Sequence, residues 1–165
     1  MYIRDYLHSR RVWFETLLHP PVPSASRFAQ RLHISGRSVA KSVLVKCGDR
    51  FLLAVLPATS RIDWERLADV VPGEPLTLAT EDEASQVFGD CERGALPPFG
   101  RLYGLTTIVD SSLAGGAEIV FVANCRHEGM RMRYRDFEAL ELPIRARFAT
   151  TTTPRQRRPS SRRAG

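Results

Sequence analysis

Lysine is almost absent from this chain of 165 residues, because only Lys41 and Lys46 among its 24 basic residues are not arginine. Arginine therefore supplies nearly all of the positive charge that the surface needs. A lysine kept against this preference suggests a task that arginine does not perform. Its compact ammonium fits a small cavity, can hold a carbonyl oxygen, and shifts its pKa on burial. The two lysines are therefore the first candidates for a functional site.

Both lysines lie in the segment Val39–Cys47, which we predict to form one strand. Side chains alternate across a strand, so Lys41 shares a face with Val43 and other apolar residues, whereas Lys46 shares the opposite face with Ser42. We expect Lys41 to point toward an apolar interior. Alternatively, Lys41 is a charged residue at a sheet edge that prevents pairing with another strand. The strand pattern leaves both interpretations of Lys41 open.

Cysteine is also scarce, with Cys47, Cys91 and Cys125 widely spaced. An odd count without a Cys-x-x-Cys pair argues against a disulfide framework and against the usual zinc motifs. Cys125 and His127 could lie on one face of a strand and share a metal, but two ligands do not make a site. We therefore predict no metal and no other cofactor.

Long hydrophobic runs are missing as well. No stretch approaches the roughly 18 apolar residues that a membrane helix requires. The start of the chain, Met1–Tyr6, lacks the basic, apolar and small-residue regions of a secretory signal. We expect no contact with a membrane and a location in the cytoplasm.

Acidic residues are absent after Glu141, and residues 150–165 contain five arginines. The rest of the chain is nearly neutral, with 19 basic and 18 acidic residues. Residues 150–165 have no apolar side chain larger than alanine, so we predict a disordered basic tail after a domain spanning residues 1–149. The tail could bind nucleic acid phosphates or merely aid solubility, and the sequence does not decide between these.

The common catalytic signatures do not occur. There is no Gly-x-Ser-x-Gly elbow, no phosphate-binding Gly-x-x-x-x-Gly-Lys and no dinucleotide fingerprint. The four histidines, at positions 8, 19, 33 and 127, are scattered, and none can be paired with a serine or cysteine from the sequence. A hydrolase of this sequence would therefore work without a conventional nucleophile triad.

Short elements alternate along the body of the chain. Helices are expected at Ile3–Ser9, from the N-cap Ser24 to Leu32, after Asp63, after Thr80 and from Arg135 to Leu142. Strands are expected at Val12–Leu17, Val39–Cys47, Phe51–Leu56, Leu76–Ala79, Thr106–Val109, Glu118–Val122 and Met130–Tyr134. Strands outnumber helices and are not separated by regular crossover helices. This order predicts a single α+β domain whose mostly antiparallel or mixed sheet curls and is surrounded by helices.

The densest cluster of special residues is the loop Gly89–Gly100, which contains three glycines and a double proline. Such a backbone is stiff, allows a ligand to approach closely and can direct N–H groups at a developing oxyanion. A purely structural turn is the alternative interpretation of the same composition.

Five segments in order resemble the YbaK/prolyl-tRNA-synthetase-associated domain family, whose members hydrolyse mischarged tRNA. They are Val39–Val45, Leu53–Pro57, Leu78–Glu81, Phe88–Gly100 and Val109–Leu113. The resemblance runs from about residue 10 to residue 148 and omits the tail. It implies the fold of that family.

The resemblance also implies site residues. Lys41 matches the central active-site lysine of the family, and His127 matches a histidine that some members place near the substrate. Many relatives have a glycine shortly before that histidine, where this chain has Asn124, a residue that tolerates a left-handed backbone. The substrate-binding loop implied by the resemblance comprises Gly94, Ala95, Leu96, Pro97, Pro98 and Gly100.

The function implied by the resemblance is that of a free-standing deacylase, which hydrolyses the ester of mischarged aminoacyl-tRNA. Its partners would be the 3′ end of an aminoacyl-tRNA and an aminoacyl-tRNA synthetase. A non-catalytic module that binds tRNA or a synthetase, and a hydrolase for another small activated ester, remain alternatives. The amino acid is also open among alanine, serine, threonine, cysteine and proline.

Overall fold

The computed structural model describes residues 2–151, which form six α-helices, one short 3-10 helix and ten strands. The helices are α1 (Ile3–Ser9), α2 (Ala25–Arg31), α3 (Trp64–Val70), α4 (Glu81–Val87), η1 (Gly100–Tyr103), α5 (Ser111–Ala114) and α6 (Tyr134–Glu141). The strands are β1 (Phe14–Leu18), β2 (Ala40–Cys47), β3 (Arg50–Pro57), β4 (Ser60–Ile62), β5 (Leu76–Leu78), β6 (Thr106–Asp110), β7 (Glu118–Val122), β8 (Glu128–Arg133), β9 (Ile144–Ala146) and β10 (Ala149–Thr151). None of the helices within residues 2–151 is long and apolar enough to cross a membrane.

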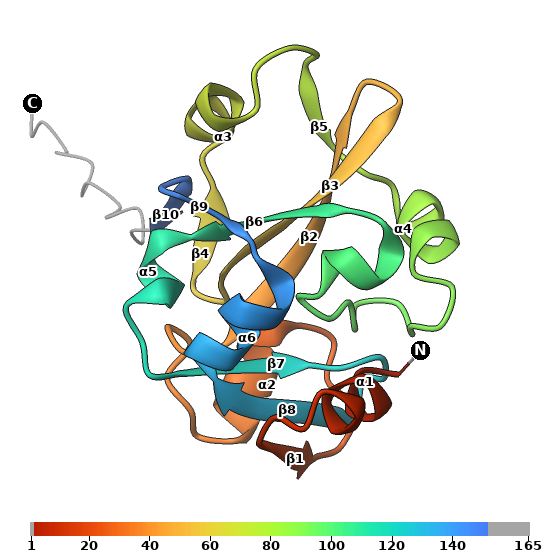
Figure 1. Cartoon of the computed structure of the whole chain (residues 1–165), viewed down its shortest axis with the longest axis vertical. Helices are drawn as coiled ribbons and strands as arrows, with labels where there is room; N and C mark the ends of the chain where they lie inside the picture. Colours follow the sequence, from red (N-terminus) through yellow and green to blue (C-terminus); the bar gives the residue numbers. More distant parts are fainter. Residues whose placement is uncertain (1, 152–165) are drawn as a thin grey trace, which may run out of the picture.

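The strands are divided among three sheets (Figure 1). The largest has five strands in the order β5-β2-β3-β6-β9, with antiparallel pairs at β5-β2-β3 and parallel pairs at β3-β6-β9. A second, antiparallel sheet has the order β1-β8-β7, and β10 pairs with β4 in the third. The prediction of a mixed α+β domain is confirmed.

The β2-β3 hairpin forms the centre of the large sheet. Cys47 pairs with Arg50, and Gly48 between them has φ +58°, a left-handed conformation that favours glycine. A single parallel bridge from Val39 to Val120 joins this sheet to the three-stranded sheet. The strand that carries both lysines therefore lies where the two sheets meet.

The main hydrophobic core lies against one face of the large sheet and includes residues of α1, α6 and the three-stranded sheet. At its centre Phe99 makes edge-to-face contacts with Tyr6, Phe121 and Phe137, with ring centroids 5.9, 5.7 and 5.4 Å apart. A further core on the opposite face of the large sheet includes Leu67 of α3. Both faces of β2 are therefore packed.

The alternation predicted for β2 is confirmed. Ala40 and Leu44 belong to the main core, whereas Val45 belongs to the core on the opposite face. Lys41 thus lies on the face of Val45, and Lys46 lies on the face of Leu44, as the strand period requires.

The first two residues of the predicted tail lie in a strand. Thr150 and Thr151 belong to β10, where they pair with Arg61 and Ser60 of β4. Main-chain pairing and the strand preference of threonine order these residues without any apolar burial, which the composition of the segment could not indicate. The remaining part of the predicted tail, residues 152–165, lies outside the described residues.

Candidate functional site

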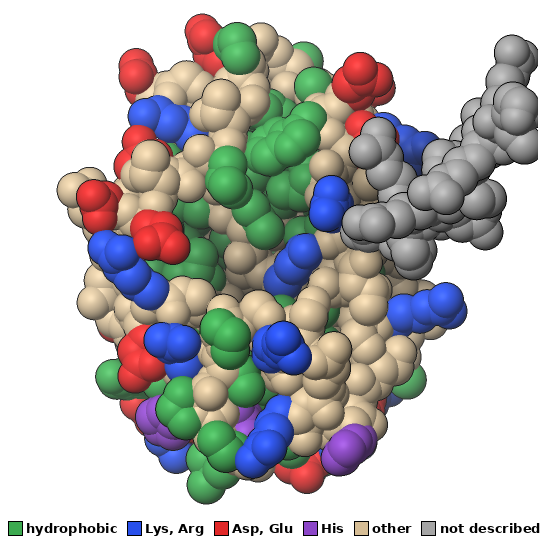
Figure 2. All heavy atoms as spheres, turned by 180° about the vertical axis from the view of Figure 1, so that it is seen from behind, with side chains coloured by type: hydrophobic (Ala, Val, Ile, Leu, Met, Phe, Trp, Pro, Cys, Tyr) green, Lys and Arg blue, Asp and Glu red, His purple; other side chains and the backbone are tan. Residues whose placement is uncertain are grey.

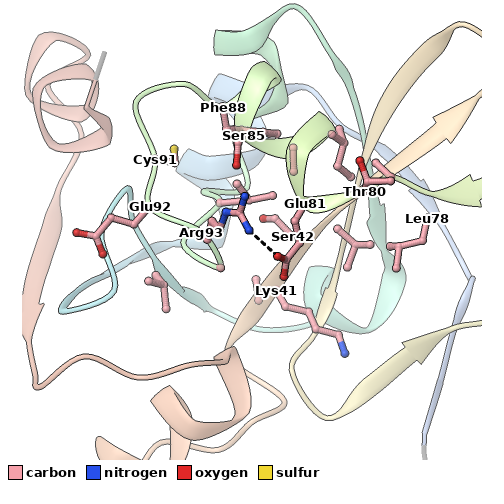
Figure 3. A pocket seen from close by; sticks show the side chains of 18 residues that line it. Lys41, Ser42, Leu78, Thr80, Glu81, Ser85, Phe88, Cys91, Glu92 and Arg93 are labelled. Atoms are coloured by element: carbon pink, nitrogen blue, oxygen red, sulfur yellow. Dashed lines mark hydrogen bonds and ion pairs between the residues drawn. The ribbon is translucent and has the colours of Figure 1, made fainter.

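A cavity of about 270 Å³ opens beside the first half of β2 (Figure 3). Its walls come from residues 40–44 of β2, residues 78–85 around the start of α4, and residues 88–96 of the following loop. Seen from behind, the molecular surface is hollowed along its middle, where apolar side chains are exposed and Lys and Arg side chains lie in and below the hollow (Figure 2). The elements that the sequence singled out thus meet around one space.

The cavity exists because the outer edge of β2 is only partly covered. Strand β5 pairs with Val45, Lys46 and Cys47, and the N–H of Ala79 then donates to the carbonyl of Leu44 at 3.1 Å. Just before β2 begins, β7 is joined to the chain by the bridge between Val39 and Val120, and within the described residues no strand pairs with this edge of β2 between that bridge and Val45. The cavity therefore borders a stretch of open sheet edge.

Ser42 presents several hydrogen-bonding groups to this opening. Main-chain N–H and C=O groups alternate in direction along an antiparallel strand, so Ser42 faces the same edge as Leu44. The Ser42 hydroxyl is buried and has no hydrogen-bond partner among residues 2–151. Ser42 also lines the cavity, and so it can offer a donor and acceptors to a ligand.

Lys41 lines the cavity and is partly buried. Among the described residues its ammonium has no hydrogen bond and no ion pair. Partial burial lowers the pKa of Lys41, and the positive charge of Arg61 on β4 lowers it further. In Figure 3 its side chain extends away from Phe88 and Cys91, so the cation and the deep apolar wall lie at different sides of the cavity.

Lys46 has a different environment. Its ammonium lies 2.7 Å from a carboxylate oxygen of Glu83 on α4, and this hydrogen bond raises the pKa of Lys46. The pair is only partly buried, so solvent screening weakens it. Lys46 therefore has a carboxylate partner, whereas Lys41 has none among the described residues.

The loop after α4 turns sharply at Gly94, which has φ +79°. Ala95 is buried, and its N–H already donates to the carbonyl of Glu92 at 3.1 Å. Pro97 and Pro98 have no N–H. Within the part of the chain that the structure describes, the N–H groups of Gly94 and Leu96 make no hydrogen bond, and these two residues line the cavity.

The structure separates the remaining predicted site residues from the cavity. Ala95, Pro97, Pro98 and Gly100 are buried residues of the loop and do not line the cavity. His127 is exposed in the turn between β7 and β8 and does not line it either. The predicted set thus divides into Lys41, Gly94 and Leu96, which meet at the cavity, and residues that support the loop or lie elsewhere.

A family model for the aminoacyl-tRNA editing domain matches residues 19–140, well over half of the chain. The chain belongs to the aminoacyl-tRNA editing domain family. The residues that line the cavity, including Lys41, and the loop Gly89–Gly100 all lie within the matched residues.

Solved structures share the fold of this editing domain. Hypothetical protein APE2540 has a TM-score of 0.81 at 17% identity, with 90% of this chain and 99% of that chain covered. A proposed trans-editing enzyme for prolyl tRNA synthetase has a TM-score of 0.79 at 21% identity, with 90% and 94% covered. A proposed signal transduction protein from Marinobacter aquaeolei VT8 has a TM-score of 0.70 at 19% identity, with 90% of this chain but 30% of that chain covered. At these identities the likeness establishes the fold.

Cys91 is a further residue of the cavity wall of this editing domain. Burial raises the pKa of its thiol to about 11, because the thiolate loses hydration there. Its sulfur lies 3.4 Å from the hydroxyl of Tyr103 and accepts a hydrogen bond of 3.4 Å from the side-chain amide of Asn124. Cys91 is therefore a neutral thiol near pH 7, and it is poorly suited to nucleophilic attack.

An ion-pair bridge closes the outer wall of the cavity. The guanidinium of Arg93 lies 2.9 Å from Glu81 and 3.0 Å from Asp82, both in the first turn of α4 (Figure 3 shows the bond to Glu81). All three side chains are well exposed, so the bridge is salt-sensitive and can open without a large energetic cost.

Sequence reasoning did not identify Ser42, Glu81, Ser85, Phe88 and Arg93 as cavity residues. The capping box that begins α4 was visible in the sequence, but a cap says nothing about what the helix packs against. These residues line the cavity because α4 lies beside an open edge of β2, and the sequence does not indicate that arrangement.

Proposed function

We propose that this chain is a trans-editing deacylase that hydrolyses the ester of mischarged aminoacyl-tRNA. One observation supports this most strongly: in a member of the editing-domain family, the same cavity is lined by Lys41, Gly94 and Leu96, and the Lys41 ammonium and the N–H groups of Gly94 and Leu96 have no partner among residues 2–151. The partners of the reaction would be the 3′ end of an aminoacyl-tRNA and the synthetase that releases it. The cytoplasm is the compartment expected for this reaction.

The proposed chemistry needs no protein nucleophile. The ester that joins an amino acid to a terminal ribose is already activated, so a water molecule can attack its carbonyl carbon. The acyl–oxygen bond to the ribose then breaks, and the products are the free amino acid and a tRNA with a free terminal hydroxyl. The substrate's neighbouring ribose hydroxyl can assist the water, which agrees with the neutral thiol of Cys91.

Lys41 would supply positive charge for this step. Its ammonium is compact, partly buried and unpaired among the described residues, so it can hold the ester carbonyl and stabilise the negative charge that develops on its oxygen. The N–H groups of Gly94 and Leu96 would act on the same group. Removing one donor of this kind commonly costs about 2.7–4 kcal/mol of barrier, or about 10²–10³ in rate.

The opposite side of the cavity would hold the amino acid. Ala84 and Phe88 of this wall are apolar, and the cavity of about 270 Å³ limits the size of the side chain that can enter. The main-chain carbonyl and the hydroxyl of Ser42 are acceptors that suit the α-ammonium of an aminoacyl ester. Alanine, serine, threonine, cysteine and proline esters all remain candidates.

The test is a deacylation assay on a panel of mischarged tRNAs with the wild type, Lys41→Ala and Lys41→Arg. We expect Lys41→Ala to lower the deacylation rate about 10²–10³-fold. Lys41→Arg should also be slow, because the planar guanidinium of arginine does not replace a compact ammonium. Lys46→Ala is the matched control, since Lys46 lies on the same strand but points to the other face, and it should keep full activity. Circular dichroism of each variant establishes that the fold is intact.

Equal turnover by the wild type and Lys41→Ala would refute the proposal. If the wild type binds tRNA but hydrolyses no aminoacyl ester, the chain is a binding module with this fold instead. A tail truncation tests whether residues 152–165 contribute, because loss of phosphate contacts would lower both the affinity and its salt dependence.

A further inference from the structure

The turn between β7 and β8 brings three potential metal ligands together outside the cavity. The thiol of Cys125, the imidazole of His127 and the carboxylate of Glu128 each place a ligand atom within 4.8 Å of the other two. The sequence suggested only the first two of these residues, which do not make a site. We propose that Cys125, His127 and Glu128 bind one divalent ion of the zinc class, independently of the proposed deacylation.

The two distances from the Cys125 sulfur suit such an ion. The Cys125 sulfur lies 3.7 Å from Nε2 of His127 and 3.9 Å from Oε2 of Glu128. A tetrahedral zinc ion with bonds of about 2.3 Å to sulfur and about 2.0–2.2 Å to nitrogen and oxygen separates its sulfur from the other ligands by about 3.6 Å. The sulfur-centred edges are therefore within a few tenths of an ångström of the required geometry.

The backbone of the turn is held in place before any ion binds. Asn124 adopts φ +61°, and its side-chain oxygen accepts a hydrogen bond of 2.9 Å from the N–H of Ile3. Its carbonyl accepts one of 2.7 Å from the N–H of Glu92, and the carbonyl of His127 accepts one of 3.0 Å from the N–H of His19. A fixed turn lowers the ordering cost of binding, which is the advantage of preorganisation.

One cation already lies near the proposed site. The Arg4 guanidinium is 3.8 Å from Oε2 of Glu128, the same oxygen that faces Cys125. This contact is long, and the Arg4 side chain is 53% exposed, whereas that of Glu128 is 13% exposed. Arg4 can therefore move into solvent when an ion takes the carboxylate, and we expect it to compete weakly with the ion.

The ligand set selects the class of ion. A thiolate with an imidazole suits zinc, cobalt and cadmium, whereas magnesium and calcium prefer oxygen ligands. Binding replaces the thiol proton of Cys125 with a metal–sulfur bond and releases that proton to the buffer. His127 is exposed, so a water molecule can occupy a fourth position.

The test is a cobalt titration of the full chain without an affinity tag. We expect one ion per chain, a thiolate-to-cobalt charge-transfer band in the ultraviolet, and displacement of cobalt by zinc but not by magnesium. Cys125→Ser should lose the band, whereas Cys47→Ser and Cys91→Ser should keep it. Residues 152–165 contain no cysteine, histidine or acid and so offer no competing side-chain ligands.

Two further variants address the other ligands, and a third addresses the competing cation. His127→Ala and Glu128→Gln should each weaken binding at least about tenfold, since even changes around the ligands cost about 10–100-fold. Arg4→Gln should strengthen it. Circular dichroism without metal shows that each variant is folded. The proposal is overturned if the folded wild type gives no thiolate band, or if the band survives in Cys125→Ser.

Discussion

Replacing Asp110 with alanine should destabilise the fold strongly. Asp110 ends β6 and is only 3% exposed. Its Oδ1 accepts hydrogen bonds from the N–H groups of Phe148 at 3.0 Å and Ala149 at 2.8 Å, and its Oδ2 accepts from the N–H of Ser112 at 3.1 Å and from the Ser112 hydroxyl. One carboxylate therefore ties the start of α5 to the segment that enters β10.

The expected loss is large because alanine leaves donors without partners. The N–H groups of Phe148 and Ala149 would be left unpaired, and a buried group of this kind costs about 1–3 kcal/mol. Two such groups give about 2–6 kcal/mol, compared with the roughly 5–15 kcal/mol by which a domain is stable. Urea denaturation of the wild type and Asp110→Ala measures this difference directly.

Asp110→Asn is the matched control. It keeps a carbonyl oxygen that can accept from Phe148 and Ala149, but its amide group opposes the N–H of Ser112. We therefore expect the free energy of unfolding of Asp110→Asn to lie between those of the wild type and Asp110→Ala. If Asp110→Ala lowers the free energy of unfolding by less than about 1 kcal/mol, the hydrogen bonds of Asp110 do not stabilise the fold as buried hydrogen bonds should.

The pH dependence provides a second readout for Asp110. Burial alone would raise its pKa, but hydrogen bonds from Ser112 and from the N–H groups of Ala149 and Phe148 outweigh it, and the pKa is lowered. A carboxyl whose folded pKa is below its unfolded value stabilises fully above that unfolded value, and the benefit is lost as the pH falls through the folded pKa. Below about pH 4 the wild type should lose stability more steeply than Asp110→Ala. Parallel acid profiles would contradict this explanation.

Helix starts could be predicted because capping is local. Ser24, Asp63 and Thr80 were expected to cap helices, and each side chain accepts a hydrogen bond from the backbone three residues later. The missed strands β4, β9 and β10 have three residues each, too few to show a period of two. Their pairing depends on partners distant in sequence, so composition assigned Thr150 and Thr151 to a tail.

The candidate site could be predicted in part, for the same reason. The period of the strand gave the faces of Lys41 and Lys46, since it depends only on neighbouring residues. It could not reveal that Lys46 meets Glu83 whereas Lys41 meets no acid among the described residues. The position of Ser42 at the cavity could not be predicted either, because it depends on the part of the β2 edge that β5 leaves uncovered.

Two further substitutions test the packing and the electrostatics of the core. Gly129→Ala should lower the free energy of unfolding by about 1–3 kcal/mol in urea denaturation. The new Cβ would lie 2.3 Å from Cζ of the buried Phe28 and 3.2 Å from the carbonyl oxygen of Phe121. An unchanged urea midpoint would show that Phe28 moves freely. Glu141 is 1% exposed, and burial raises its pKa even though its carboxylate accepts hydrogen bonds, one of them from the N–H of Arg101 at 3.0 Å. A carboxyl whose folded pKa is raised contributes stability below its unfolded pKa, and this contribution is lost as the pH rises through the folded pKa. Glu141→Gln cannot ionise and keeps a carbonyl acceptor, so its stability relative to the wild type should increase as the pH rises from about 4 to about 8. Urea midpoints across that range measure the difference, and parallel curves for the two proteins would mean that Glu141 is solvated in the folded state.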